Sequence, residues 1–304
     1  MKRFIGRALL FLLPVLVALA GWEVLMRNFP HVFKYKKDVI LNKCREDGEY
    51  VFLGSSHAFF GVDTDELPHA YNLAFSAQKL RHDRFIFEML ASGPNRLKYV
   101  AVPVSIFSFF RYLHDLEEWR EHNYVRYWGF PAKKFSDHFF IFDKIPLQLV
   151  YVRKMHKDIG KHGLCEAFDI TPTGWGTSYR ASGRPGEFAA QGKATARRHC
   201  SVDADDTREF DELKALIELA GKHGIKVILY TPPGHKSYHT ELDPELLKKM
   251  HSMISELTAG RGVYYLDLLR SDAFQDEDFF DPDHLSARGA KKLTRMLGDF
   301  CKDK

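Results

Sequence analysis

The feature that most constrains the fold of this 304-residue chain is an alternation of short apolar runs with segments of helical period. The apolar, β-rich runs, each bounded by turn residues, lie at 50–53, 70–74, 99–104, 225–230 and 263–266. Segments between them repeat apolar residues at helical spacing, as 210–220 does. Alternating strands and helices predict a parallel sheet with helices on both faces, in which ligands bind beyond the carboxyl ends of the strands.

Length and composition narrow the class of protein. A chain of 304 residues can form one large α/β domain with insertions. Its 45% hydrophobic and 28% charged residues are ordinary values for a globular protein. The formal net charge is only +4, and the basic residues are scattered along the chain rather than gathered into one stripe. We therefore expect no nucleic-acid partner.

The N-terminus has the pattern of an export segment. Lys2, Arg3 and Arg7 precede an uncharged, mostly apolar run at 8–22, and the apolar pattern resumes at 24–26. A membrane span needs about 20 predominantly apolar residues, which this segment reaches only when its flanks are included. The position behind a basic head favours export over a buried helix of the domain.

Two interpretations of this segment stay open. Small residues at 18–20 (Ala-Leu-Ala) suit a signal peptide that is cleaved, which would release a secreted protein. We favour an uncleaved single-pass anchor at 1–27, followed by a juxtamembrane lead-in at 28–49. In either case the rest of the chain is expected on the extracytoplasmic (periplasmic) side of the cell membrane.

Residues 50–304 are expected to form one α/β domain that is interrupted by an insert or lid at 106–205, where the strand–helix alternation stops. Inserts of this length commonly form lids, subdomains or partner surfaces. This one is rich in aromatic residues, which suit a small core of their own or a platform for sugar rings; we favour the core. The aromatic residues are Phe107, Phe109, Phe110, Tyr112, Trp119, Tyr124, Tyr127 and Trp128.

The chain contains four cysteines, at 44, 165, 200 and 301. None of them has the C-x-x-C spacing of a zinc site. An even number of cysteines in an oxidising compartment permits disulfides, and four cysteines allow three pairings. Among these pairings we favour Cys165 with Cys200, which would close the middle insert.

A serine on a sharp turn and a distant Asp/His pair are the residues most able to carry chemistry. The sequence at 54–57 is Gly-Ser-Ser-His, directly after the first apolar run, and at 281–284 it is Asp-Pro-Asp-His, before the last helical segment. A serine hydroxyl is a poor nucleophile until a base takes its proton, and a carboxylate commonly orients that base. We predict Ser56 as the nucleophile, His284 as the base and Asp281 as its orienting carboxylate.

Each of these assignments has a competitor. Ser55 is the alternative nucleophile, and Asp283 is the alternative orienting carboxylate. Either motif alone is typical of an ordinary polar turn, and only their joint occurrence at the two ends of the βα pattern favours catalysis. A metal site built from Asp281, Asp283 and His284 is a further alternative. No second His/Asp cluster accompanies it, so we expect neither a metal nor a cofactor.

With these motifs the chain resembles the SGNH/GDSL hydrolase family. The family's first block is a strand followed by Gly-Asp-Ser, whose place is taken here by 54–56 (Gly-Ser-Ser). Its last block is D-x-x-H before the closing helix, matched by Asp281 and His284. The resemblance covers roughly 50–105 and 225–300. It implies a flavodoxin-like three-layer α/β sandwich with a central parallel sheet.

The resemblance also implies an oxyanion hole, and here the sequence departs from the family. The family's N-x-G-x-x-G block is replaced at 72–77, so the backbone N–H of Ala74 would stand in for that of a glycine. Its Gly-x-Asn-Asp block is not recognisable, and Ser105 is a partial replacement for the asparagine. The backbone N–H of Ser56 completes the expected set. Loss of one oxyanion donor typically costs about 2.7–4 kcal/mol of transition-state stabilisation.

The Gly-Ser-Ser variant behind an N-terminal anchor is similar to the envelope branch of this family, whose members acylate or deacylate surface polysaccharides. This similarity implies a serine esterase or O-acyltransferase acting on acyl, mainly acetyl, esters of a cell-surface glycan. It also implies a membrane-bound O-acyltransferase as a possible partner. From the loop at 231–238, His235, Lys236 and Tyr238 are expected to contact substrate or else to cap the loop.

A non-catalytic interpretation stays open. The chain could be an SGNH-shaped accessory protein that binds glycan or a membrane-bound O-acyltransferase. The missing third block and the long insert favour this interpretation, whereas the retention of Ser56, Asp281 and His284 argues against it. The sequence does not distinguish hydrolysis from acyl transfer.

Overall fold

The computed structural model describes residues 2–112, 118–183 and 185–304. Within the described residues the chain forms two compact units. Unit 1 comprises Met1–Lys37 and Glu118–Phe168, and unit 2 comprises Asp38–Glu117 and Asp169–Lys304. The predicted insert at 106–205 is therefore divided: its middle part belongs with the N-terminal segment, and its two ends belong with the sheet-containing unit.

Unit 2 is built on a parallel sheet whose strand order is β2-β1-β3-β6-β7. The five strands coincide with the five apolar runs of the sequence. They read as nearly continuous apolar segments because helices bury both faces of the sheet. Their bounds are β1 (Tyr50–Phe52), β2 (Ala70–Asn72), β3 (Tyr99–Pro103), β6 (Lys226–Thr231) and β7 (Val263–Asp267).

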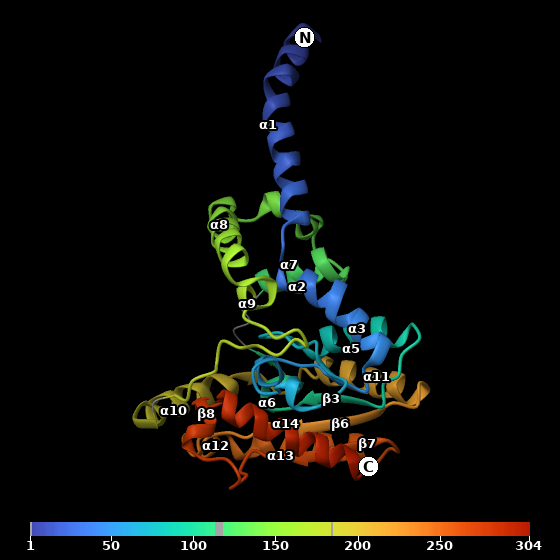
Figure 1. The fold of residues 1–304 in the computed structure, drawn as a ribbon, viewed down its shortest axis with the longest axis vertical. Coiled ribbons are helices and arrows are strands. Elements are labelled where there is room, and N and C mark those ends of the chain that lie inside the picture. The colour runs from blue at the N-terminus through green and yellow to red at the C-terminus, as the bar shows by residue number, and fades with distance from the viewer. Residues whose placement is uncertain (1, 113–117, 184) are drawn as a thin grey trace. The chain divides into compact units, whose positions relative to one another are not determined.

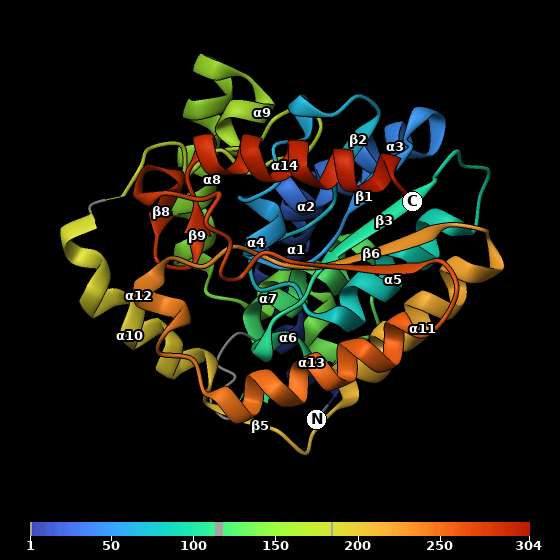
Figure 2. The same ribbon diagram turned by 90° about the horizontal axis from the view of Figure 1, so that it is seen from below.

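Helices cover the sheet on both faces, which confirms the predicted α/β sandwich. Figure 2 shows α14 on one side of the strands and α5, α11 and α13 on the other. The bounds of these helices are α5 (Leu80–Ala91), α11 (Arg208–Lys222), α13 (Pro244–Thr258) and α14 (Ala287–Lys302). Each presents an apolar stripe to the sheet. In α14 the residues at 293, 297 and 301 are buried against strand residues such as Phe52 and Tyr230.

The two last helices begin at capping residues. Asp243 accepts hydrogen bonds from the N–H groups of Glu245 and Leu246 at 2.8 and 3.1 Å and starts α13. The hydroxyl of Ser286 accepts from the N–H of Gly289 at 3.4 Å at the start of α14. Such side chains satisfy N–H groups that have no partner inside the helix. The cap at Ser286 places the preceding turn, 281–284, beside the sheet.

Short elements complete unit 2. Two small antiparallel pairs, β4 with β5 and β8 with β9, lie outside the main sheet. The short elements are α3 (Leu41–Asp47), α4 (Ser56–Phe59), η2 (Thr64–Glu66), α6 (Ile106–Phe109), β4 (Arg111–Tyr112), η6 (Pro185–Glu187), α10 (Phe188–His199), β5 (Val202–Asp203), α12 (Lys236–His239), η7 (Asp276–Asp278), β8 (Phe279–Asp281) and β9 (His284–Leu285). Among them α4, α6, α12 and the β8–β9 pair follow the carboxyl end of a sheet strand in the chain.

Unit 1 consists of helices. Its long α1 is followed by shorter elements and by α8, which Figure 1 shows beginning level with the C-terminal end of α1. The elements are α1 (Lys2–Asn28), α2 (Val32–Tyr35), α7 (Glu118–Asn123), η3 (Tyr124–Trp128), η4 (Phe135–His138), η5 (Phe140–Phe142), α8 (Ile145–His162) and α9 (Leu164–Ala167), and the π-helical η1 (Lys36–Ile40) leads from unit 1 into unit 2.

The helix α1 contains one stretch that is long and apolar enough to cross a bilayer. This stretch, Phe11–Asn28, has 18 residues and a mean hydropathy of 1.4, and only 6% of it is buried within the protein. A core helix of a soluble domain with this composition would be mostly covered. The finding agrees with the predicted anchor in length and composition.

The aromatic residues of the predicted insert are mostly buried. Phe109, Phe110, Tyr124 and Trp128 are each at most 2% exposed, which favours the small-core interpretation over a sugar platform. They divide between the two units, so they form parts of two cores rather than one. The side chains of Tyr112 and Trp119 lie outside the described residues.

The favoured disulfide between Cys165 and Cys200 is wrong, because all four cysteines of the chain are free thiols in the structure. The two residues belong to different compact units. Each has a local contact instead: the Cys165 Sγ lies 3.2 Å from the Tyr35 hydroxyl, and the Cys200 Sγ accepts from the N–H of Asp243 at 3.3 Å.

Candidate functional site

The turn that follows β1 holds Ser56 in a defined position. Gly54 has a φ of +110°, a conformation that favours glycine, and a Cβ added there would lie 2.4 Å from side-chain atoms of Pro103. The Gly54 N–H donates to the buried carboxylate of Asp83 at 2.8 Å. Ser55 then stands at the N-cap of α4, and Ser56 is the first residue of that helix. The chain is thereby turned so that Ser56 leaves the carboxyl end of β1.

Ser56, His284 and Asp281 form a continuous hydrogen-bonded relay. The Ser56 Oγ lies 2.8 Å from the His284 Nε2, and the His284 Nδ1 lies 3.0 Å from both carboxylate oxygens of Asp281. Asp281 is itself held, because its Oδ1 accepts the backbone N–H groups of Asp283 and His284 at 3.0 and 2.9 Å. The structure therefore brings the three predicted residues together in the geometry that a nucleophile, a base and an orienting carboxylate need.

The competing carboxylate, Asp283, lies in a different environment. Its Oδ1 is 3.5 Å from the His284 Nδ1, beyond the 3.0 Å of Asp281. Its Oδ2 lies between two further histidines, 3.6 Å from the His57 Nε2 and 3.7 Å from the His199 Nε2. Burial alone would raise the pKa of Asp283, but the neighbouring His284 and His57 hold it well below its usual range. Asp283 is therefore a buried anion beside the relay.

Two histidines of this site, His57 and His199, carry no role in the sequence interpretation. Both are nearly buried, and burial lowers the pKa of His199 to about 3, so that its ring is neutral at ordinary pH. The His199 Nδ1 lies 2.8 Å from the hydroxyl of Tyr238. Proximity to Ser56 along the chain could have drawn attention to His57. No local signal marks His199, which lies in the segment where the βα pattern stops.

The charges around His284 set its proton affinity. Burial by itself would lower the pKa of His284, but the Asp283 carboxylate and the hydrogen bond with Asp281 raise it above the ordinary value of 6.5. One carboxylate is hydrogen-bonded to the ring and the other is 3.5 Å away. This arrangement favours the imidazolium form that a base acquires when it takes a serine proton.

Two of the three predicted oxyanion donors already have hydrogen-bond partners in the structure. The N–H of Ala74 donates to the Asn72 Oδ1 at 3.1 Å, so this donor is already committed in the structure. The asparagine is held in turn, since its amide donates to the carbonyl of Ala58 in α4 and to that of Val62 beyond this helix. The Ser105 hydroxyl lies 3.0 Å from that of Ser108 and takes part in the capping of α6. Ser56 remains the better-placed donor, because the first N–H groups of a helix have no acceptor within it.

The three predicted substrate contacts of the 231–238 loop do not behave alike. His235 caps α12, because its Nδ1 accepts from the backbone N–H of Ser237 at 3.2 Å. The backbone N–H of His235 donates to the carbonyl of Pro282. Tyr238 is buried against His199. Lys236 is exposed. The capping alternative therefore describes His235, and Tyr238 supports the buried histidines rather than a surface.

An aromatic stack that the sequence interpretation did not single out lies beside His284. The ring of Tyr179 is stacked between those of Phe60 and Phe280, with centroid distances of 4.0 Å to each. The edge of this stack faces the imidazole: Tyr179 lies 5.3 Å from His284 in a T-shaped arrangement. The three residues come from the end of α4, from the 169–187 segment and from β8, so only the fold assembles them.

One group of side chains in the described residues could hold a metal ion. The ligand atoms of His57, Asp283 and His284 all lie within 4.8 Å of one another. This set differs from the metal alternative considered from sequence, because His57 takes the place of Asp281. Both ring nitrogens of His284 already have partners, Ser56 and Asp281. A metal ion bound by His284 would therefore compete with the relay.

No protein-family model and no curated protein matches this chain. Solved structures align with most of the chain at low sequence identity. One, a candidate platelet activating factor of Streptococcus pneumoniae, is 12% identical with a TM-score of 0.43 over 94% of this chain and 98% of its own. A candidate acylhydrolase of Bacteroides fragilis is 12% identical with a TM-score of 0.42 over 88% of this chain and 95% of its own.

A GDSL-like lipase of Bacteroides thetaiotaomicron is 11% identical with a TM-score of 0.41, over 90% of this chain and 99% of its own. At these identities and TM-scores the three likenesses carry no conclusion about the chemistry of the chain. The chemistry of this chain is therefore argued from its own side chains.

Proposed function

We propose that the protein catalyses acyl-ester chemistry through a covalent intermediate on Ser56. The observation that carries this proposal is the relay from the Ser56 Oγ through His284 to Asp281, with distances of 2.8 and 3.0 Å. His284 takes the hydroxyl proton as the Ser56 Oγ attacks the acyl carbon. It then gives that proton to the departing alcohol oxygen when the tetrahedral intermediate collapses, which leaves an acyl-serine.

The second half of the reaction decides between hydrolysis and transfer. Water or a sugar hydroxyl gives its proton to His284 and attacks the acyl-serine. When this second tetrahedral intermediate collapses, His284 returns the proton to the Ser56 Oγ and the acyl product leaves. A sugar acceptor makes the protein an O-acyltransferase, and water makes it an esterase. We propose an acetyl ester of a cell-surface glycan as substrate, in keeping with the motif resemblance and with the half-buried side chains of Tyr179 and Phe280 in the aromatic stack beside His284.

A serine-reactive phosphonate tests the proposed nucleophile. The full-length protein is expected to be labelled and to hydrolyse an activated acetyl ester, and Ser56→Ala is expected to abolish both. The matched control is Ser55→Ala, which removes the neighbouring hydroxyl and leaves the relay intact. Labelling of Ser56→Ala as strong as that of the parent would show that this assignment is wrong.

An accessory role is the second candidate, and one observation favours it. The N–H of Ala74 is bonded to Asn72 and the Ser105 hydroxyl is engaged with Ser108, so two of three proposed oxyanion donors are occupied. Such a protein would bind glycan or a membrane-bound O-acyltransferase without turnover. A parent protein that is neither labelled nor active, yet retains a glycan oligosaccharide on a column, would establish this role.

The activity is expected to depend on the protonation of His284. The ring accepts a proton only when neutral, so kcat/KM should rise with pH as His284 loses its proton. Since the neighbouring carboxylates raise the pKa of His284, the midpoint should lie above the 6.5 of an unperturbed histidine. Asp281→Asn, which removes one of these charges, should move the midpoint down. A kcat/KM profile with its acidic limb at or below pH 6.5 in the parent would contradict this expectation.

We further propose that α1 anchors the protein in the cell membrane, with unit 2 on the extracytoplasmic (periplasmic) side. The length and mean hydropathy of Phe11–Asn28 support a spanning helix. An alkaline phosphatase fusion after Lys37 is expected to be active outside the cytoplasm of a bacterial host. An inactive fusion that is stably produced would reverse the proposed orientation.

A further inference from the structure

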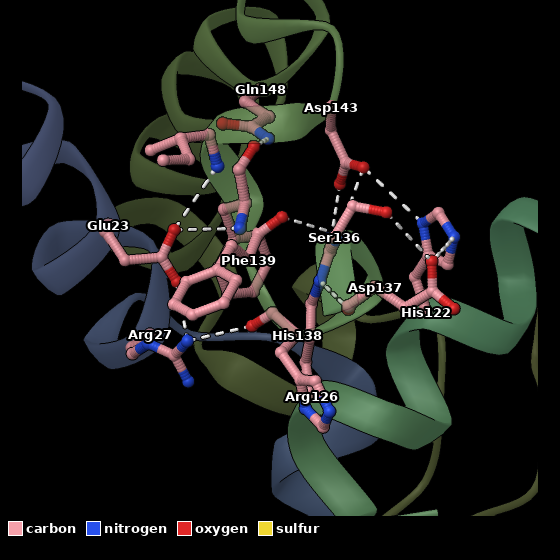
Figure 3. Close-up of polar contacts among 12 residues, drawn as sticks. Glu23, Arg27, His122, Arg126, Ser136, Asp137, His138, Phe139, Asp143 and Gln148 are labelled. Carbon is pink, nitrogen blue, oxygen red and sulfur yellow. Dashed lines mark hydrogen bonds and ion pairs between the residues drawn. The ribbon is translucent and has the colours of Figure 1, made fainter. Parts of the chain in front are cut away.

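The C-terminal end of α1 is fastened to the segment at 138–148 by polar contacts inside unit 1 (Figure 3). The carboxylate of Glu23 accepts the backbone N–H groups of Phe140 and Ile141 at 2.8 and 3.2 Å. Arg27 donates to the carbonyl of His138 at 2.8 Å and pairs with Glu23 at 2.7 Å. These bonds fix the height of the segment along the helix axis.

A further contact fixes the start of α8 at the same height. The indole N–H of Trp22 donates to the side-chain oxygen of Gln148, and the amide of Gln148 donates to the carbonyl of Phe140 at 2.7 Å. Trp22 is six residues before the end of the apolar stretch at Asn28. At 1.5 Å per residue, the contact lies about 9 Å from that end. If α1 spans a bilayer, residues held here lie at the boundary between acyl chains and headgroups.

Large apolar side chains are exposed at this height. Phe135 is 77% exposed, Phe142 60%, Leu147 64% and Val150 63%. The rings of Phe135, Phe139 and Phe142 form a cluster, with centroid distances of 5.0 and 6.2 Å along it, and the Arg27 guanidinium lies 5.7 Å from the Phe139 ring. The cluster is thus continuous with the end of α1. Left in water, such a patch is unfavourable by about 25 cal/mol per Å².

Basic side chains border the apolar residues: Lys134 and Lys144 are exposed beside Phe135 and Phe142, and further basic residues follow along α8. Leu149 and Val150 are exposed near the start of α8, and Arg153 and Lys154 are exposed one turn later. Figure 1 shows α8 running on beyond the C-terminal end of α1, so the later turns of α8 lie farther along the axis than its first turn. Apolar side chains followed by basic ones match the order of acyl chains and anionic headgroups in a bilayer.

We propose that this apolar surface, formed by Phe135, Phe142, Leu147 and Val150, inserts into the same leaflet that α1 leaves, as a second membrane contact of the protein. The occupant is the acyl-chain boundary of a phospholipid bilayer. The inference rests on the proposal that α1 spans a membrane and adds a surface to it. The hydrogen bonds of Glu23 and Trp22 join this surface to α1. Two joined membrane contacts fix the orientation of unit 1 on the bilayer, whereas a single flexible anchor would leave it free to turn.

Fluorescence quenching by brominated phospholipids tests the insertion. The full-length protein is reconstituted into phosphatidylcholine–phosphatidylglycerol vesicles with lipids brominated near the headgroup end of the chains. Phe142→Trp and Val150→Trp each add an indole on the surface, and Lys161→Trp is the control. That control lies on the same helix, 11 residues or about 16 Å beyond position 150. The emission added by each variant is measured against the parent protein. The chain has three further tryptophans, so the share of the parent emission that comes from Trp22 is taken as the share lost in Trp22→Phe.

The added emission of Phe142→Trp and Val150→Trp is expected to be largely lost in brominated vesicles, whereas that of Lys161→Trp is expected to persist. Quenching of Trp22 in the parent without quenching at positions 142 and 150 would overturn the second contact and leave the anchor intact. Parent emission that brominated lipid does not change would overturn the anchor and, with it, this inference. Equal quenching at all three positions would contradict the proposed boundary along α8.

Discussion

His284→Ala is expected to lower kcat/KM for an activated acetyl ester by roughly 10⁴-fold or more. The substitution removes the ring that is bonded to the Ser56 hydroxyl at 2.8 Å, so the serine keeps its proton at the moment of attack. It also removes the acid that protonates the departing alcohol. Steady-state kinetics with purified full-length protein measure the loss, and circular dichroism shows that the fold is retained.

The two carboxylates near His284 provide a matched comparison for this effect. Asp281→Asn is expected to cost nearly as much as His284→Ala, because an amide at 3.0 Å from Nδ1 favours the wrong tautomer of the ring. Asp283→Asn should cost much less in turnover, since that carboxylate lies 3.5 Å from the ring and does not orient it. A larger loss for Asp283→Asn would make Asp283 the orienting residue and reverse the assignment.

Gly54→Ala is expected to destabilise unit 2 by at least about 2 kcal/mol, from a strained backbone together with overpacking. The φ of +110° is one that side chains other than glycine's rarely adopt, and the new Cβ would lie 2.4 Å from the Pro103 ring. Relief of that clash must move the turn that carries Ser56. We therefore expect a lower urea midpoint and a loss of phosphonate labelling in the protein that remains folded.

A glycine without these constraints supplies the control for this substitution. Gly221 lies in α11, and a Cβ added there meets nothing within 4 Å. Gly221→Ala should leave labelling unchanged and stabilise the protein by about 0.5–1 kcal/mol, because alanine loses less backbone freedom on folding. A Gly54→Ala variant that unfolds at the parent midpoint would show that the turn at position 54 does not require glycine.

The sheet was predictable because its signals are local. Each strand is a continuous apolar run, and a run buried on both faces by helices needs no information from distant residues to be recognised. The positions of Ser56 and of the Asp281–His284 turn were predictable for the same reason, because their signals are local too. Ser56 follows a strand directly, and the spacing of Asp281 and His284 lets one turn supply both residues. Parallel topology then brings the carboxyl ends of the strands to one edge.

The disulfide prediction and the prediction for Ala74 depend on contacts between segments that are distant in the chain. The pairing of Cys165 with Cys200 was inferred from their place in one insert, but the insert divides between two compact units. Ala74 keeps an N–H that could serve an oxyanion, yet the side chain of Asn72, held from α4, takes that bond. A residue's hydrogen-bond partner is a property of the packed structure, and residue type alone does not reveal it.

The sequence by itself determined the class of fold, the position of Ser56 after the first strand and the Asp281–His284 turn, since each follows from patterns within a few residues. Only the tertiary structure decided that Asp281 rather than Asp283 bonds the imidazole. Only it placed Asp283 between His57 and His199, which are 142 residues apart in the chain. The physical reason is that burial and distance set the proton affinities and partners of these groups, and both arise when remote segments pack together.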